Sequence, residues 1–147
     1  MKKFIFSLEK VLDFKQQTLD IKKNEIAVFQ MKLHEIEMEI EDLNDRFSVS
    51  NAKMVEEMQQ GITQNDISIY KMYFDTLNQK TQKLLDDKIK LLEIIAQKKI
   101  ELIQINSEIS GLEKLKDKQL AEYLKIKQKS DELAIDEFVS QARSSAR

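Results

Sequence analysis

The stretch QQGITQND, residues 59–66, decides how this chain folds, because it holds one of only two glycines in a sequence of 147 residues without proline. Gly61 suits the left-handed backbone conformation in which many helices end. Thr63, with Asp66 three positions later, fits the pattern that begins a helix, although Asp replaces the usual Glu or Gln. A helix end followed directly by a helix start predicts a short turn between two helices that run in opposite directions.

Apolar residues recur at alternating steps of three and four on both sides of this turn, which is the pattern of a coiled-coil seam. Before the turn, one series of seam positions is apolar throughout, and it reads Leu12, Leu19, Ile26, Leu33, Ile40, Phe47. After the turn, the apolar members of the matching series are Tyr70, Leu77, Leu84, Leu91, Ile105, Leu112, Ile126 and Leu133. The sequence therefore predicts an all-α protein, a long antiparallel two-helix coiled-coil hairpin whose second helix overhangs the first.

We expect a single coiled-coil domain over residues 1–147. Its parts are expected at about residues 5–60 for the first helix, 61–63 for the turn, 64–140 for the second helix and 141–147 for a frayed basic tail. If the chain folds back at Gly61, facing residues have numbers that add to about 124. Roughly residues 121–140 of the second helix then lie beyond the first.

The composition excludes several classes of protein. The 24 basic and 26 acidic residues are well mixed, so we expect no nucleic-acid partner, which usually requires a basic patch. The opening MKKFIF is too short for the apolar part of a signal peptide, and no run approaches the ~18 apolar residues of a membrane span. We expect a soluble, cytoplasmic protein that does not insert into a membrane.

Nothing in the sequence points to catalysis. His34 is the sole histidine, and its position beside Leu33 places it on the helix surface, just outside the seam. There is no cysteine and no glycine-rich phosphate loop. The acidic run EIEMEIED, residues 35–42, repeats with the heptad and is expected to form a solvated face. We therefore expect no catalytic residue, no metal site and no cofactor.

Five lysines interrupt the seam, at Lys15, Lys22, Lys88, Lys98 and Lys116. In the expected register no layer of the seam brings two polar residues together. We expect the lysine stems to lie along the seam and their ammonium groups to reach water. These lysines imply a modest intrinsic stability, which binding to a partner would raise.

Two apolar features exceed what a two-helix seam requires. The first is an N-terminal cluster that covers more than one side of a helix and comprises Phe4, Ile5, Phe6, Leu8, Val11, Leu12 and Phe14. The second is Tyr73, which points away from the seam, whereas its neighbours Tyr70 and Phe74 are seam residues. Large exposed apolar side chains on a thin hairpin indicate contact with a partner.

Three stretches carry a resemblance to a known family. FIFSLEKVLDFK, residues 4–15, resembles the start of FliJ, the flagellar type III export protein family. GITQNDISIYKMYFDTL, residues 61–77, resembles the segment that follows the turn in that family, and KQKSDELAIDEF, residues 127–138, resembles its lysine-rich tail. The length and the hairpin layout agree over the whole chain.

The resemblance implies a non-enzymatic stalk and adaptor, monomeric when free, at the inner face of the flagellar type III export apparatus. It implies partners in the hexameric export ATPase, the export-gate membrane protein and the chaperones of late substrates. The end that bears both termini would enter the ATPase ring, through Phe4, Phe6, Leu8, Val11, Leu12, Tyr123, Ile126, Leu133 and Phe138. The contact with the export gate would include Leu43, Tyr73 and Leu77.

Two alternatives remain at this point. A purely structural coiled coil that forms a parallel dimer requires a helix that runs through Gly61. The equivalent stalk of a needle-type secretion system would differ from the flagellar protein only in the motifs quoted above.

Overall fold

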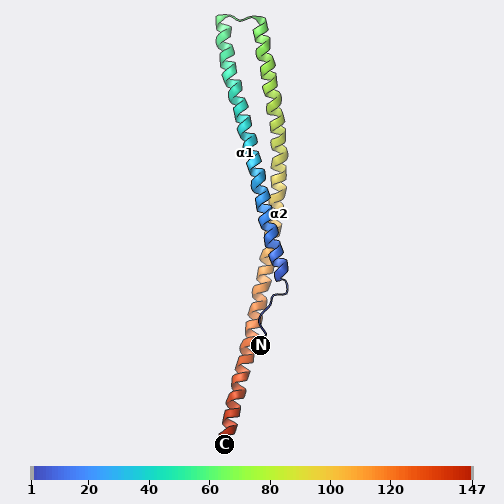
Figure 1. The fold of residues 1–147 in the computed structure, drawn as a ribbon, viewed down its shortest axis with the longest axis vertical. Helices are drawn as coiled ribbons and strands as arrows, with labels where there is room; N and C mark the ends of the chain where they lie inside the picture. The colour runs from blue at the N-terminus through green and yellow to red at the C-terminus, as the bar shows by residue number, and fades with distance from the viewer. Residues whose placement is uncertain (1, 147) are drawn as a thin grey trace. The chain divides into compact units, whose positions relative to one another are not determined.

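The computed structural model describes residues 2–146, and its regular structure consists of two long helices (Figure 1). Helix α1 spans Glu9–Gln60 and helix α2 spans Gln64–Ser145. Residues far apart in the sequence face each other across the two helices, as in the ion pair of Lys88 with Glu37. This confirms the predicted all-α, antiparallel two-helix hairpin.

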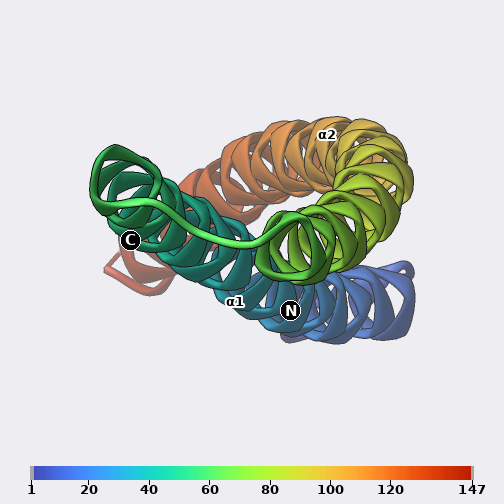
Figure 2. The same cartoon turned by 90° about the horizontal axis from the view of Figure 1, so that it is seen from above.

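Figure 2 shows the short segment that joins α1 to α2. This turn has the predicted local chemistry. Gly61 has a positive φ of 93°, and its N–H donates a hydrogen bond to the carbonyl oxygen of Met58 over 3.3 Å. The hydroxyl oxygen of Thr63 accepts a hydrogen bond of 3.1 Å from the N–H of Asp66 and so caps α2. Because α1 ends before Gly61, the continuous helix that a parallel dimer requires is not formed, and that alternative is wrong on this point.

Two compact units make up the described chain, and each consists of a stretch of α1 beside a stretch of α2. The turn unit is Lys22–Glu101, and the terminal unit combines Met1–Ile21 with Leu102–Arg147. The single coiled-coil domain that we expect over residues 1–147 stays a prediction.

The turn unit is packed through the predicted seam. Its buried side chains are all apolar seam residues, namely Ile26, Leu43, Leu77, Leu91 and Ile95. Nearer the turn the rings of Phe47 and Phe74 lie with their centres 4.8 Å apart. Within residues 44–76, all of which the structure describes, no side chain is fully buried. The part of the hairpin nearest the turn is therefore held by half-buried contacts.

The terminal unit has a small apolar core at the start of α1. Phe6, Leu12 and Ile109 are buried, and the half-buried residues packed around them are Phe4, Leu8, Leu19, Ile105 and Leu112. Four residues of the N-terminal cluster, Phe4, Phe6, Leu8 and Leu12, thus pack in this core. The expectation that the cluster is surplus to the packing of the two helices is wrong for these four.

Helix α1 begins four residues later than expected, at Glu9 instead of residue 5. Residues 2–6 have no regular secondary structure. In an extended segment alternate side chains point to the same side, so Phe4 and Phe6 both reach α2 while Ile5 between them is 81% exposed. A helix would separate Phe4 and Phe6 by about 200° and remove one of them from the core.

Beyond the core of the terminal unit, α2 continues without a partner helix (Figure 1). Residues 124–145, which we call the overhang, are all exposed. The helix extends to Ser145, five residues past the expected end, because Gln141–Ser145 includes Ala142 and Arg143 and no glycine or proline to stop it. The predicted overhang of the second helix is confirmed.

The two glycines of the chain provide a matched test of the turn. Replacing Gly61 by Ala should lower the free energy of unfolding by about 1 kcal/mol, because an L side chain is strained at positive φ. Gly111 is a helical residue with no atom within 4 Å of an added Cβ, so replacing it by Ala should raise the free energy of unfolding by about 1 kcal/mol. Urea denaturation followed by circular dichroism measures both. Two changes of the same sign would contradict the assignment of Gly61 to the turn.

Candidate interaction site

All five seam lysines form ion pairs with glutamates of the facing helix. In the terminal unit the pairs are Lys15–Glu108 at 2.6 Å and Lys116–Glu9 at 2.9 Å, and in the turn unit they are Lys22–Glu101 at 2.9 Å, Lys98–Glu25 at 2.9 Å and Lys88–Glu37 at 3.4 Å. The residue numbers in each pair add to 123 or 125, which confirms the expected register. The lysine side chains stay partly exposed, and their ammonium groups also meet carboxylates, which was not expected from the sequence.

The position of each lysine in the heptad determines which glutamate it meets. With Leu12 and Phe74 at position a, Lys15, Lys22 and Lys98 lie at d, and their facing glutamates lie at g. The two lysines at position a, Lys88 and Lys116, instead meet glutamates at position e. In an antiparallel pair, g faces g and e faces e along opposite edges of the seam. The lysine–glutamate pairs could have been predicted from the sequence, since a glutamate stands one place from the residue that faces each lysine.

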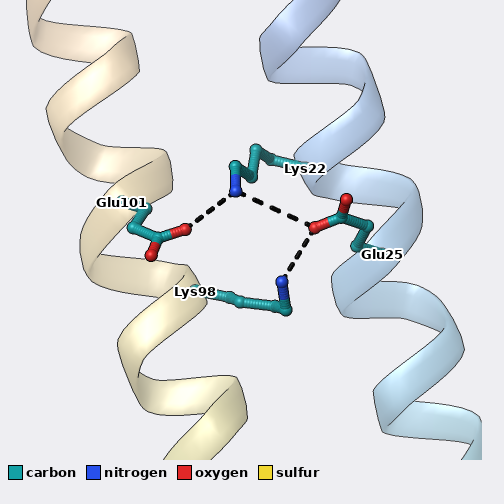
Figure 3. A network of polar contacts seen from close by, with 4 residues as sticks. All are labelled: Lys22, Glu25, Lys98 and Glu101. Atoms are coloured by element: carbon teal, nitrogen blue, oxygen red, sulfur yellow. Dashed lines mark hydrogen bonds and ion pairs between the residues drawn. The ribbon is translucent and has the colours of Figure 1, made fainter.

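Four of these residues form a connected network in the turn unit (Figure 3). The Nζ of Lys22 lies 2.9 Å from Oε2 of Glu101 and 3.9 Å from Oε2 of Glu25, which also receives Lys98 at 2.9 Å. The same Lys98 Nζ lies 5.4 Å from the centre of the Phe29 ring. Glu25 thus joins a lysine of its own helix to one of the other helix. Sliding the helices would break the two contacts between them, Lys98–Glu25 and Lys22–Glu101.

The charges in this network reinforce one another. Hydrogen bonds from Lys98 and Lys22 hold the pKa of Glu25 and of Glu101, respectively, below the ordinary carboxyl value. The hydrogen bond to Glu101 raises the pKa of Lys22. Ion pairs this exposed to water add little stability. Their main effect is on register, because a slip of the helices leaves lysines in the seam without carboxylates.

The residues predicted for the ATPase ring fall into two groups. Those that pack inside the terminal unit are Phe4, Phe6, Leu8, Leu12 and Tyr123. The rings of Phe4 and Tyr123 are 5.5 Å apart, and the Tyr123 hydroxyl donates a 2.5 Å hydrogen bond to the carbonyl oxygen of Lys2. The exposed group is Val11, Ile126, Leu133 and Phe138, of which Phe138 is 72% exposed. Their assignment to a ring contact stays a prediction.

The three residues predicted for the export gate also differ in exposure. Leu43 is 8% and Leu77 3% exposed, whereas Tyr73 is 39% exposed with its ring against Phe74. Most of the surface of Leu43 and of Leu77 is therefore closed to a partner while the two helices stay paired. Tyr73 alone presents a free surface, and the role of all three stays a prediction.

Sequence reasoning missed three apolar residues of the overhang, Leu124, Ile135 and Val139, all of which are exposed. None of the three lies at a seam position of α2. Ile135 is nine residues after Ile126, or about two and a half helical turns, so the two side chains project from opposite sides. A search for a second apolar series with helical spacing would have found them.

The described residues offer little to chemistry. Among residues 2–146, no group of three or more His, Cys, Asp or Glu side chains could hold a metal ion. His34 lies exposed on α1, as the heptad predicts. A hollow of about 400 Å³ in the turn unit is lined by Leu43, Leu84 and charged side chains of both helices. Over the same described residues, neither helix has a stretch long and apolar enough to span a bilayer.

Comparison with known proteins gives one match. The family model described as flagellar FliJ protein matches residues 4–147, which include both helices, the turn and the overhang. No curated protein and no solved structure matches the chain. The matched family is flagellar, which favours that assignment over the stalk of a needle-type secretion system.

The ion pairs predict an acid-sensitive hairpin. A carboxyl with a lowered folded-state pKa adds stability above its unfolded value of 4.5, and this stability is lost as the pH falls through the folded value. The free energy of unfolding should therefore drop as the pH falls below about 4.5. The Glu101→Gln variant should show a smaller drop, measured by urea denaturation across the acid range.

The control for this prediction is Glu41→Gln, since Glu41 is exposed on α1 and enters no ion pair with the described residues. Its acid dependence should equal that of the unaltered chain. If Glu101→Gln and Glu41→Gln behave alike, the facing pairs do not contribute to the acid response.

Proposed function

The chain belongs to the flagellar FliJ protein family, and from this membership we propose that it is a non-catalytic stalk and adaptor of the flagellar type III export apparatus. The end that bears both termini enters the ring of the hexameric export ATPase. The region near the turn contacts the export-gate membrane protein, and chaperones of late substrates are further partners. The protein acts in the cytoplasm, at the inner face of the apparatus, and is monomeric when free.

The overhang is the observation that carries this proposal. It is a helix without a partner, and its exposed apolar side chains lie on opposite sides, as Ile126 and Ile135 show. A flat surface or a single helix can cover only one side of it. A partner that encloses the helix, as a ring does, can cover both sides and remove all of these side chains from water.

In this proposal the predicted ring residues have two roles, which follow their exposure in the terminal unit. Val11, Ile126, Leu133 and Phe138 are exposed and available for direct contact. The buried and half-buried residues, Phe4, Phe6, Leu8, Leu12 and Tyr123, hold the extended N-terminal segment against α2. In this proposal they shape the end that enters the ring and do not themselves touch it.

A protein without chemistry of its own can act on an ATPase only by binding one state of it better than another. Burial of an exposed Leu or Phe side chain yields about 1.5–3 kcal/mol, so a few overhang residues are enough to shift the assembly or the state of a ring. Such a shift requires that these contacts form in one state of the ring and not in the other.

Contact with the export gate rests on Tyr73 in this proposal. A half-exposed aromatic ring with a polar tip is a frequent anchor of protein interfaces. Its ring is held against Phe74, which packs in turn on Phe47 across the seam. Leu43 and Leu77 then contribute by packing the helices on which the gate surface lies.

The ring contact is tested with the double variant Leu133→Ala/Phe138→Ala. Both side chains are exposed in the free protein, so the free energy of unfolding should change by less than about 0.5 kcal/mol. Affinity for the purified hexameric export ATPase should fall by about tenfold or more, and stimulation of ATP hydrolysis should fall with it. The matched control is Val49→Ala/Ile69→Ala, at exposed sites of the turn unit. If unaltered protein does not bind the ATPase, the proposed function fails.

The gate contact is tested with Tyr73→Ala. Affinity for the cytoplasmic domain of the export-gate protein should fall by about tenfold, while affinity for the ATPase stays unchanged. Leu77→Ala is the contrasting variant, because removal of this buried side chain should lower the free energy of unfolding by about 2–4 kcal/mol. Equal gate binding by Tyr73→Ala and unaltered protein would remove Tyr73 from the interface.

A further inference from the structure

The overhang carries its charges in two successive belts of opposite sign. The first, the lysine belt, comprises Lys125, Lys127 and Lys129, with no acidic residue from 124 to 130. The second, the acidic belt, comprises Asp131, Glu132, Asp136 and Glu137, with no basic residue from 131 to 142. The preceding part of α2 differs, since residues 113–118 read EKLKDK and mix the two signs.

Both belts extend around the helix. Residues four apart share a side of a helix and residues two apart do not, so Lys125 and Lys129 lie on one side and Lys127 on the other. The four acidic residues are spread over most of the circumference by the same geometry. The centres of the two belts are seven residues apart, or about 10 Å along the helix axis.

The belts have no facing partners in the described structure. Residues 124–145 are all exposed, and no ion pair of residues 2–146 involves them. The seam lysines differ in this respect, because each has a glutamate on the opposite helix. Charges that surround a helix and face no opposing helix fit an enclosing surface of complementary charge.

We propose that the surface that receives the overhang has an acidic belt opposite Lys125–Lys129 and a basic belt opposite Asp131–Glu137, about 10 Å apart. The inference rests on the proposed function, in which that surface is the inner wall of the export ATPase ring. The belts set the depth of insertion. Displacement of the helix by about 10 Å in either direction brings like charges together, whereas apolar contacts alone tolerate such a displacement.

A second copy of the chain is the competing occupant. Two overhangs in antiparallel arrangement would also place lysine belts opposite acidic belts. One further helix, however, covers only one side of the overhang, and either Ile126 and Leu133 or Ile135 would stay in water. An enclosing partner satisfies both the apolar side chains and the charges.

The lysine belt is tested with Lys125→Gln/Lys127→Gln/Lys129→Gln, which keeps good helix formers at all three sites. Affinity of the full chain for the purified hexameric ATPase should fall by about tenfold at ~0.05 M salt, and the difference should shrink at ~0.5 M. The control Lys53→Gln/Lys71→Gln/Lys90→Gln makes the same change in net charge in the turn unit and should bind like the unaltered chain. Circular dichroism checks the helix content of each variant.

The acidic belt is tested with Asp131→Asn/Glu132→Gln/Asp136→Asn/Glu137→Gln, which should also weaken binding in a salt-dependent way. If both belt variants bind like the unaltered chain while Leu133→Ala/Phe138→Ala binds weakly, the inference is overturned and the proposed function stands. If the unaltered chain does not bind the ATPase at all, the proposed function itself fails. If sedimentation shows a dimer that the belt variants lose, the belts pair two copies and the inference is again overturned.

Insertion depth has a direct readout, because the chain contains no cysteine. A single Ser130→Cys change places a thiol between the belts, and its rate of alkylation in the ATPase complex reports how deeply it lies. In the lysine-belt variant the protection of this thiol should decrease. Equal protection in both backgrounds would show that the belts do not set the depth.

Discussion

Two helices can bury only one stripe of each, and most of this molecule follows from that limit. Where the two helices are paired, the seam takes up most of the apolar residues at positions a and d, and most other apolar side chains of the helices stay in contact with water. A seam this narrow has few ways to fix its register by shape alone. The lysines within it supply the missing constraint, because at the observed register all five have a carboxylate of the facing helix within reach.

The hairpin could be predicted from sequence because its determinants are local. Gly61 and Thr63 act on the backbone within a few residues, and the seam repeats every seven. The start of α1 could not be predicted from the same pattern. Phe4 and Phe6 lie on the same side of an extended segment, from which both reach the core that contains Ile109 of α2. A helical turn would remove one of the two rings from this core, and a local sequence pattern does not contain that information.

The candidate site was predictable in part, for a similar reason. The resemblance assigned Ile126, Leu133 and Tyr73 to contacts with partners, and the structure leaves these side chains accessible. The resemblance also assigned Leu43 and Leu77 to a contact, although both are seam residues that the facing helix covers. The lysine partners were missed because glutamates at e and g look like ordinary surface charge until the facing helix is in place.

The same limit on burial explains how the chain can serve as an adaptor. In the paired part of the terminal unit, the apolar residues of the core are covered by their own chain, so they add to its stability and are withheld from partners. The overhang has the opposite property, since its apolar side chains and charges are exposed on all sides and add nothing to the hairpin. A partner that covers them gains their full burial without unfolding any part of the protein. An unpaired, preformed helix is therefore well suited to binding, because little conformational order has to be created on association.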